Sequence, residues 1–204
     1  MKQIITVQHT QSVHHTNGMV ASWTDWDLTQ LGVKQADTIG RNLYSELSDR
    51  SVVIYSSDLK RASQTAQQIN KYFHTEILLR SELRERNLGK CVGKSVLWLR
   101  DNMEIQEKTI YDRMFSDAES RKDVWDRLEP FYQEIINEKH SHIIVVSHGD
   151  LLSVFNAMWL KLDVHALNHS DMWGFAGGVS WFTQKEDGKH LIRKLSDMSY
   201  LSDK

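Results

Sequence analysis

The sequence predicts an α/β protein in which helices cover a mostly parallel sheet. Patterns typical of strands and helices alternate along most of the 204 residues, which is the order found in parallel sheets. The segment HIIVVS at 142–147 is apolar and rich in β-branched residues, as in strands buried on both faces of such a sheet. No repeat, linker or low-complexity tract divides the chain, so we expect a single domain over 1–204.

The first half of the chain contains three expected strands separated by helices. Thr29 or Asp27 is suited to cap a first long helix, because their side-chain oxygens accept from the first free N–H groups. Ser57 or Asp58 is similarly placed before a second helix. The expected elements are strands at 2–7, 52–55 and 76–79, a helix that follows residue 29 and ends near 47, and a helix that follows residue 58 and ends near 73.

The second half is expected to begin with two amphipathic helices and to end in two late strands at an edge of the sheet. Pro130 lies within the second of these helices, and we expect it to kink or restart that helix because proline lacks the backbone N–H. The expected elements are helices at 95–114, 121–139 and 150–160 and strands at 142–147, 179–183 and 190–195.

Composition is that of an ordinary soluble globular chain. The net charge of −2 argues against a broad nucleic-acid-binding face, but a locally positive phosphate pocket remains compatible with it. Cys91 is the only cysteine, so no internal disulfide is possible, and we expect this residue to fill space in the core. No apolar run approaches the ~18 residues of a membrane span. We expect a cytoplasmic protein that binds neither nucleic acid nor membrane.

Side chains that suit phosphate chemistry follow the strands of the predicted sheet. In parallel sheets, ligands bind beyond the carboxyl ends of the strands. Two imidazoles, a carboxylate and several guanidinium groups should therefore converge at one edge and form a candidate phosphate site. These residues are Gln8 and His9 after the first strand, Lys60 and Arg61 after the second, Arg84, Glu85 and Arg86 after the third, and His148 after HIIVVS.

Phosphoryl transfer through a covalent intermediate needs only a few groups at such a site. A neutral imidazole must attack phosphorus, cations must hold the equatorial oxygens, and an acid must protonate the leaving oxygen. His9 is the candidate nucleophile, and Arg61 with His148 would hold the oxygens. Glu85 is the candidate acid, and it can serve both half-reactions because an acid that has given up its proton can take one from water.

Four sequence segments carry these residues in a fixed order. The opening QHTQSVHHTNGMVASWTDWDLTQLG contains His9, YSSDLKRASQTA contains Arg61, LRERNLGKCVG contains Glu85, and VVSHGDLL contains His148. Together they resemble the histidine phosphatase (phosphoglycerate mutase-like) superfamily, with its RHG-containing opening, second phosphate-binding arginine, acid and second active-site histidine. The segments span most of the chain, and their order makes the resemblance highly specific.

The resemblance implies a three-layer α/β/α sandwich and a phosphoric monoester hydrolase of the histidine acid-phosphatase type, with a phosphohistidine intermediate on His9. Its partner would be a small phosphorylated substrate or inorganic phosphate. Mutases of the family exclude water with a long insertion between the acid and the second histidine. Here Glu85 and His148 leave space for only a short helical lid at about 94–120, which favours a phosphatase over a phosphoglycerate mutase. We expect no cofactor, and a monomer or homodimer.

Three positions depart from the family pattern. The first arginine is Gln8, the next glycine is Thr10, and the asparagine farther along is His15. A lost hydrogen bond to a charged group costs about 1.5–3 kcal/mol, and Thr10 should resist a backbone geometry that glycine allows. Without the arginine, His9 should stay protonated to a higher pH, unless protonated His14 or His15 supplies the charge. The alternative function is a weakened member that binds a phosphorylated ligand or partner without turnover.

Further candidates concern the walls of the site. Trp23 either forms one wall of a substrate pocket or packs its loop on the core, and Arg86 either binds substrate or packs against the sheet. His9, His14 and His15 raise the question of zinc. Adjacent histidines in a loop do not readily share one metal, however, and no cysteine or HExxH spacing supports such a site. We therefore expect no metal.

Overall fold

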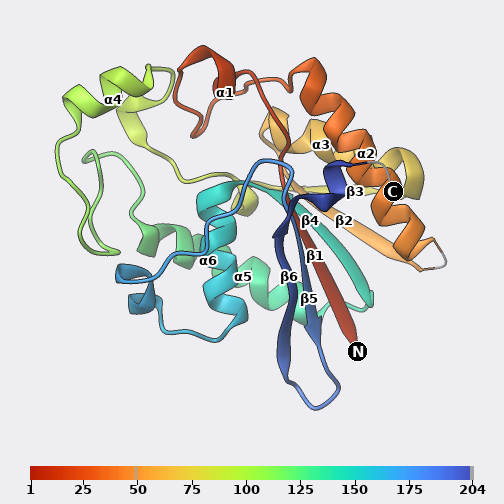
Figure 1. The fold of residues 1–204 in the computed structure, drawn as a ribbon. Helices are drawn as coiled ribbons and strands as arrows, with labels where there is room; N and C mark the ends of the chain where they lie inside the picture. Colours follow the sequence, from red (N-terminus) through yellow and green to blue (C-terminus); the bar gives the residue numbers. More distant parts are fainter. Residues whose placement is uncertain (49, 203–204) are drawn as a thin grey trace.

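The computed structural model describes residues 1–48 and 50–202, which form a six-stranded sheet in the order β3-β2-β4-β1-β5-β6 (Figure 1). Strands β1 to β4 are parallel, and β5 runs antiparallel to its neighbours β1 and β6. The mostly parallel sheet predicted from the sequence is confirmed. The strands are β1 Lys2–Gln8, β2 Val52–Ser57, β3 Ile77–Arg80, β4 His142–Ser147, β5 Val179–Gln184 and β6 His190–Asp197.

Helices cover both faces of this sheet, which confirms the three-layer sandwich. Successive residues of β1 show the two sides: Ile4 belongs to the apolar core that α5 and α6 complete, and Ile5 to the core that α2 and α3 complete. Both side chains are fully buried. The α-helices are α1 His14–Asn17, α2 Gln30–Leu47, α3 Lys60–Phe73, α4 Val96–Asn102, α5 Arg121–Asn137 and α6 Gly149–Trp159. The 3₁₀ turns are η1 Ser81–Leu83, η2 Gly89–Cys91, η3 Val164–Asn168 and η4 Met198–Leu201.

Of the two side-chain caps predicted for α2 and α3, the structure contains the one on α2. Thr29 Oγ1 accepts from the Gly32 N–H at 3.0 Å and caps α2, as predicted. The start of α3 has no side-chain cap; Ser57 Oγ instead accepts from the Leu59 N–H at 3.3 Å, one residue before the helix. Helix α5 runs through Pro130 without restarting.

The late strands differ from their expected position at the sheet edge. Of these two strands, only β6 lies at an edge of the sheet, because β5 pairs with β1 on one side and with β6 on the other. The antiparallel β5 thus closes one side of the parallel strands that carry the candidate site.

The helix expected over 95–114 is wrong beyond Asn102. After Met103 the chain turns back, and the N–H of Glu104 donates to the Met114 carbonyl at 3.0 Å. The Asp112 carboxylate accepts from the N–H of Thr109 at 2.7 Å and closes a turn there. These contacts satisfy the backbone of the segment without a second helix.

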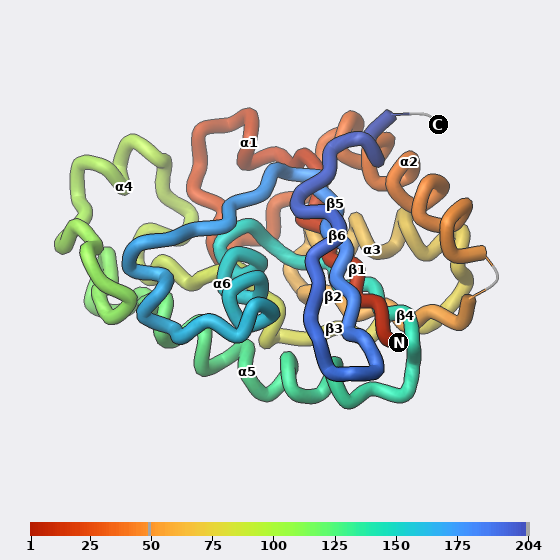
Figure 2. Tube along the Cα trace, turned by 60° about the horizontal axis from the view of Figure 1, so that its bottom comes forward, coloured from red at the N-terminus to blue at the C-terminus, as the bar shows by residue number. Residues whose placement is uncertain are grey.

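The segment 94–120 packs with Val20, Leu88 and Cys91 in a small apolar cluster apart from the two faces of the sheet. Phe115 and Cys91 are fully buried there, and Trp98 stacks on Phe115 with ring centroids 5.8 Å apart. Cys91 is therefore the core filler that the sequence predicts. Figures 1 and 2 show α4 at the end of the molecule opposite the C-terminus. Among the described residues, no helix is both long and apolar enough to span a membrane.

Candidate active site

The candidate site lies where the neighbouring strands β1 and β4 end. In the parallel register Gln8 pairs with Ser147, so the next residues, His9 and His148, leave the sheet side by side. Their ring centroids are 5.2 Å apart. The pairing of two parallel strands therefore brings together two imidazoles that lie far apart in the sequence.

His9 is held in one tautomer. Its Nδ1 lies 2.9 Å from the Thr10 carbonyl oxygen, and because a carbonyl only accepts, Nδ1 must carry the proton. Its Nε2 accepts from Arg61 Nε at 3.2 Å. The ring is 3% exposed. The lone pair of Nε2 is thus fixed in the direction of the guanidinium group.

Arg61, in the first turn of α3, is fully buried. Besides contacting His9, it donates from Nη1 to the Thr24 carbonyl and from Nη2 to the Ser22 carbonyl, each at 2.8 Å. Burial lowers its pKa to about 10, so it remains a cation at neutral pH. These bonds hold the guanidinium group against His9.

Both imidazoles at the strand ends are neutral near pH 7. Burial and the charge of Arg61 lower the pKa of His9 well below its usual value, and the same two causes act on His148. The expectation that His9 is protonated to a higher pH than in an arginine-bearing relative stays a prediction. Arg61 and the enclosed position suffice to keep His9 neutral without an arginine at position 8.

His148 is oriented by β2. Its Nε2 lies 2.8 Å from Ser57 Oγ, and this hydroxyl also accepts from the Leu59 N–H. The Nδ1 atom of His148 is buried without a hydrogen-bond partner. A buried polar atom without a partner is costly, so Nδ1 is the atom of this ring that is available to a further hydrogen-bond partner.

Glu85 occupies the cavity wall at the start of α6. Its carboxylate accepts from the Arg86 N–H at 2.9 Å and, more weakly, from the N–H groups of Asp150 and Leu151. Desolvation and the nearby charge of Asp150 raise its pKa. A carboxyl group with a raised pKa is suited to donate a proton.

Of these groups, His9 and Glu85 line a cavity of about 450 Å³, whereas Arg61 and His148 are fully buried and are not among its lining residues. One part of its wall is polar and another is apolar, with the apolar part contributed largely by residues before α2 and by segment 94–120. The lining residues are Gln8, His9, His14, His15, Met19, Val20, Ala21, Ser22, Glu85, Arg86, Leu88, Val96, Leu99, Glu107, Met114, Arg121, Gly149, Asp150 and Trp173.

Trp23 and Arg86 occupy different places relative to this cavity. Trp23 does not line it; its indole N–H donates to the Glu85 carbonyl at 2.6 Å, and Arg84 stacks on its ring. Arg86 does line the cavity, buried and paired with Glu107 at 2.9 Å and with Asp150 at 3.2 Å. Trp23 thus supports the backbone of Glu85, whereas Arg86 is part of the wall.

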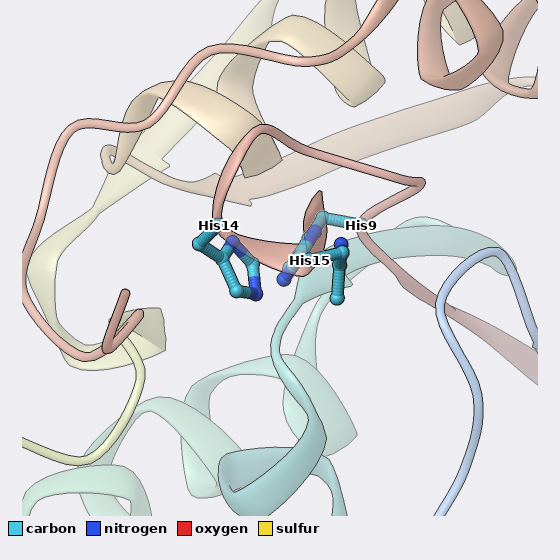
Figure 3. A group of neighbouring side chains, drawn as sticks. All are labelled: His9, His14 and His15. Atoms are coloured by element: carbon cyan, nitrogen blue, oxygen red, sulfur yellow. The ribbon is translucent and has the colours of Figure 1, made fainter. Parts of the chain in front are cut away.

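His14 and His15 lie beside His9. Their ring centroids each lie 5.6 Å from that of His9 (Figure 3). Burial lowers the pKa of His14 to about 3 and lowers that of His15. Neither ring therefore supplies a positive charge at neutral pH. The N–H of Ser12 donates to His15 Nδ1 at 3.0 Å, which leaves Nε2 of His15 as a neutral N–H donor.

Thr10 fits its position without strain. Its φ angle is not among the positive values found for non-glycine residues, and its Oγ1 donates to the Gly32 carbonyl at 2.8 Å. The position that does require glycine is Gly32, on the helix that packs against this loop, because a Cβ there would lie 1.9 Å from the Gln11 carbonyl oxygen. The expectation that Thr10 resists the loop geometry is wrong, because this loop uses an ordinary backbone conformation.

Sequence reasoning did not assign three supporting groups. Ser57 orients His148, the carbonyls of Ser22 and Thr24 hold Arg61, and Arg121 pairs with Asp150 at 3.3 Å in the cavity wall. Ser57 lies within the same matching segment as Arg61, which was a usable signal. The carbonyls and Arg121 have no sequence signal, because their roles depend on where remote segments meet.

Comparisons with known proteins agree with this geometry. A family model described as the histidine phosphatase superfamily (branch 1) matches residues 4–196. The chain belongs to this family. It is similar to the metal-independent phosphoserine phosphatase of Arabidopsis thaliana, with 30% identity over 98% of this chain and 83% of that protein. It is also similar to the 2,3-bisphosphoglycerate-dependent phosphoglycerate mutase of Cytophaga hutchinsonii, with 26% identity over 98% and 94% of the two chains.

Solved structures show the same fold. YhfR of Bacillus stearothermophilus superposes with a TM-score of 0.85 at 21% identity, over 99% of this chain and all of that one. The mycobacterial glucosyl-3-phosphoglycerate phosphatase, in its complex with inorganic phosphate, gives a TM-score of 0.77 at 19% identity over 99% and 100% of the chains. The phosphoglycerate mutase-like architecture of this histidine phosphatase family member is thereby confirmed.

Proposed function

We propose that the protein hydrolyses phosphate monoesters through a phosphohistidine intermediate on His9. The observation that carries the proposal is the state of this ring: a neutral imidazole with Nδ1–H bound to a carbonyl and the Nε2 lone pair beside the Arg61 guanidinium group. An imidazole in this form is a competent nucleophile toward phosphorus. The family membership supports the same chemistry.

In the first half-reaction, the His9 Nε2 lone pair leaves its hydrogen bond with Arg61 Nε and attacks phosphorus, and the bond to the ester oxygen breaks. Arg61 balances the charge on the equatorial oxygens, and Glu85 in its protonated form delivers its proton to the leaving alkoxide. In the second half-reaction, the Glu85 carboxylate takes a proton from water as that water attacks the phosphorus. Inorganic phosphate leaves, and both His9 and Glu85 return to their starting forms.

Neutral donors replace the missing arginine in this proposal. The His15 Nε2–H lies on the cavity wall beside His9, and Gln8 lines the same wall with an amide that can donate. His148 contributes Nδ1, which is free of protein partners. Hydrogen bonds from neutral groups hold a phosphate more weakly than an arginine does, so we expect a lower phosphate affinity than in relatives that have the arginine.

We favour hydrolysis over mutase chemistry because the cover of the cavity is short. Segment 94–120 has one seven-residue helix, and its residues Val96 and Leu99 reach the cavity. Such a cover excludes water less completely than a long insertion, so a phosphohistidine should react with water. The substrate class we propose is a small phosphorylated metabolite, as in the phosphoserine and glucosyl-3-phosphoglycerate phosphatases among the relatives.

The test is to trap the intermediate. The protein is mixed with a labelled aryl phosphate and quenched in alkali, which preserves a phosphoramidate. We expect acid-labile label on His9 and none in His9→Ala, with His74→Ala as a control on a distant histidine. Turnover of His9→Ala should fall by about a thousandfold or more. Rapid turnover without label on His9 would refute covalent catalysis, and absence of turnover by the wild type would favour a non-catalytic phosphate-binding role.

A further inference from the structure

Three histidines gather on one wall of the cavity. His9, His14 and His15 each present a ring nitrogen, and these atoms all lie within 4.8 Å of one another. Figure 3 shows the three rings side by side. The short helix α1 brings the rings of the adjacent His14 and His15 to a centroid distance of 3.8 Å. The rings of these adjacent histidines and of His9 therefore share one space, which the sequence-based argument against a metal did not consider.

The hydrogen bonds around two of these rings suit metal binding. His9 donates from Nδ1 to the Thr10 carbonyl, and the Nδ1 of His14 contacts Ser12 Oγ. Metal-binding histidines are commonly oriented by a partner on the other ring nitrogen. In His14, Nε2 is the ring nitrogen left for a metal ion, whereas Nε2 of His9 accepts from Arg61 Nε at 3.2 Å and must release that hydrogen bond to bind one.

We propose that His9, His14 and His15 bind a divalent transition-metal ion such as Zn²⁺, and that this ion inhibits the enzyme by occupying Nε2 of the nucleophile. The inhibition rests on the proposed function, whereas the binding does not. Imidazole ligands select Zn²⁺, Co²⁺, Ni²⁺ or Cu²⁺ over Mg²⁺, which prefers oxygen ligands. The ion and the substrate phosphoryl group compete for the same nitrogen.

The site is built for an exchangeable ion. A tetrahedral centre with bonds of about 2.0–2.1 Å needs nitrogens roughly 3.4 Å apart, so the rings must move inward. Neither His14 nor His15 is buried, and α1 is only four residues long, so this movement is local. His15 must release the Ser12 N–H to ligate through Nε2, and the Arg61 charge repels the ion. Both effects weaken binding relative to a structural zinc site.

The first experiment measures inhibition. Wild-type protein, freed of metal, is assayed with an aryl phosphate against increasing Zn²⁺, with Mg²⁺ as the control ion. We expect Zn²⁺ to raise KM with little effect on kcat, EDTA to reverse the effect, and Mg²⁺ to do nothing. Inhibition by Mg²⁺ equal to that by Zn²⁺, or no inhibition of an active enzyme, would overturn the proposal.

The second experiment assigns the ligands. For His14→Gln, inhibition is measured relative to that variant's own metal-free rate. The Zn²⁺ concentration for half-inhibition should rise at least about tenfold, because even the loss of a residue that only orients a metal ligand lowers metal affinity by that factor. His169→Gln removes an exposed histidine outside the site and should leave the value unchanged. Equal sensitivity of wild type and His14→Gln would show that the ion binds elsewhere and would overturn the assignment.

The third experiment does not depend on activity. Co²⁺ bound by imidazoles absorbs visible light, and its titration can be followed in wild type, His9→Ala and His14→Gln. We expect a saturable band in the wild type that is weakened in both variants. If turnover is absent but this band is present, the proposed function fails and the metal site stands. If turnover is present but the band is absent or equal in His14→Gln, the metal site fails alone.

Discussion

The two ends of the cavity are built differently. At the phosphate end, His9 is 3% exposed and Arg61 and His148 are fully buried, each held by hydrogen bonds to neighbouring strands and loops. At the far end, segment 94–120 leaves Leu97 66% and Ile105 53% exposed and packs only a small apolar cluster.

This contrast separates the chemistry from the choice of substrate. The phosphate end is set by the parallel strands β1 and β4, so its geometry depends on the register of the sheet. The far end consists of loops whose side chains can change without disturbing the sheet. We therefore expect substitutions at the phosphate end to act on kcat and those at the far end to act on KM.

The largest effect is expected from Glu85→Gln. The amide cannot protonate the leaving oxygen, so kcat should fall by about 10²–10⁴-fold, with KM for an aryl phosphate nearly unchanged. Steady-state kinetics check this, and Glu82→Gln, three residues away and outside the cavity lining, is the control. Equal losses in kcat for the two variants would show that Glu85 is not the proton donor.

A smaller gain is expected from Gln8→Arg. A charged hydrogen bond to the phosphate should raise affinity by about tenfold or more, measured as the inhibition constant of inorganic phosphate. Gln8→Met has a similar size but no donor and should weaken phosphate binding. The Gln8 amide lies against Gly149, where a Cβ would approach Nε2 to 3.2 Å, so an arginine must extend into the cavity. No gain in affinity would mean that His15 and His148 already hold every phosphate oxygen that position 8 can reach.

At the far end, Leu99→Ala should raise KM a few-fold and leave kcat unchanged. Leu99 reaches the cavity, and each buried methylene lost from an apolar contact costs about 0.8 kcal/mol. The effect should appear with an aryl phosphate but not with inorganic phosphate as inhibitor. Leu97→Ala, on the exposed side of the same helix, is the matched control. A fall in kcat without a change in KM would show that the two ends are coupled.

The smallest effect on rate, but a diagnostic one, is expected from Asp150→Asn. The proposed mechanism requires neutral His9, whose pKa is lowered, and protonated Glu85, whose pKa is raised partly by Asp150. Removing that negative charge lowers the pKa of Glu85, so the alkaline limb of the pH–rate profile should move to lower pH. Asp171→Asn, which also loses an ion pair with Arg121, should leave the limb in place. If the alkaline limb of Asp150→Asn does not move, that limb reports the titration of a group other than Glu85.

Much of the fold and the phosphate end could be predicted from the sequence, because both depend on local patterns. Neighbouring residues alone indicate the alternating strands and helices, the Thr29 cap and the apolar strand HIIVVS. Four motifs then place His9, Arg61, Glu85 and His148 after strands. Parallel pairing then brings strand ends together whatever the intervening segments do.

Only the tertiary structure decided the rest. The helix expected at 95–114 ends early because Met114 folds back to bind Glu104. The neutral state of His9 depends on burial and on Arg61, which lies 52 positions away. The rings of His14 and His15 lie close together because the four-residue helix α1 places both of them on the side of His9. Each of these outcomes depends on contacts and solvent exclusion that arise between segments, and a local sequence pattern carries no information about them.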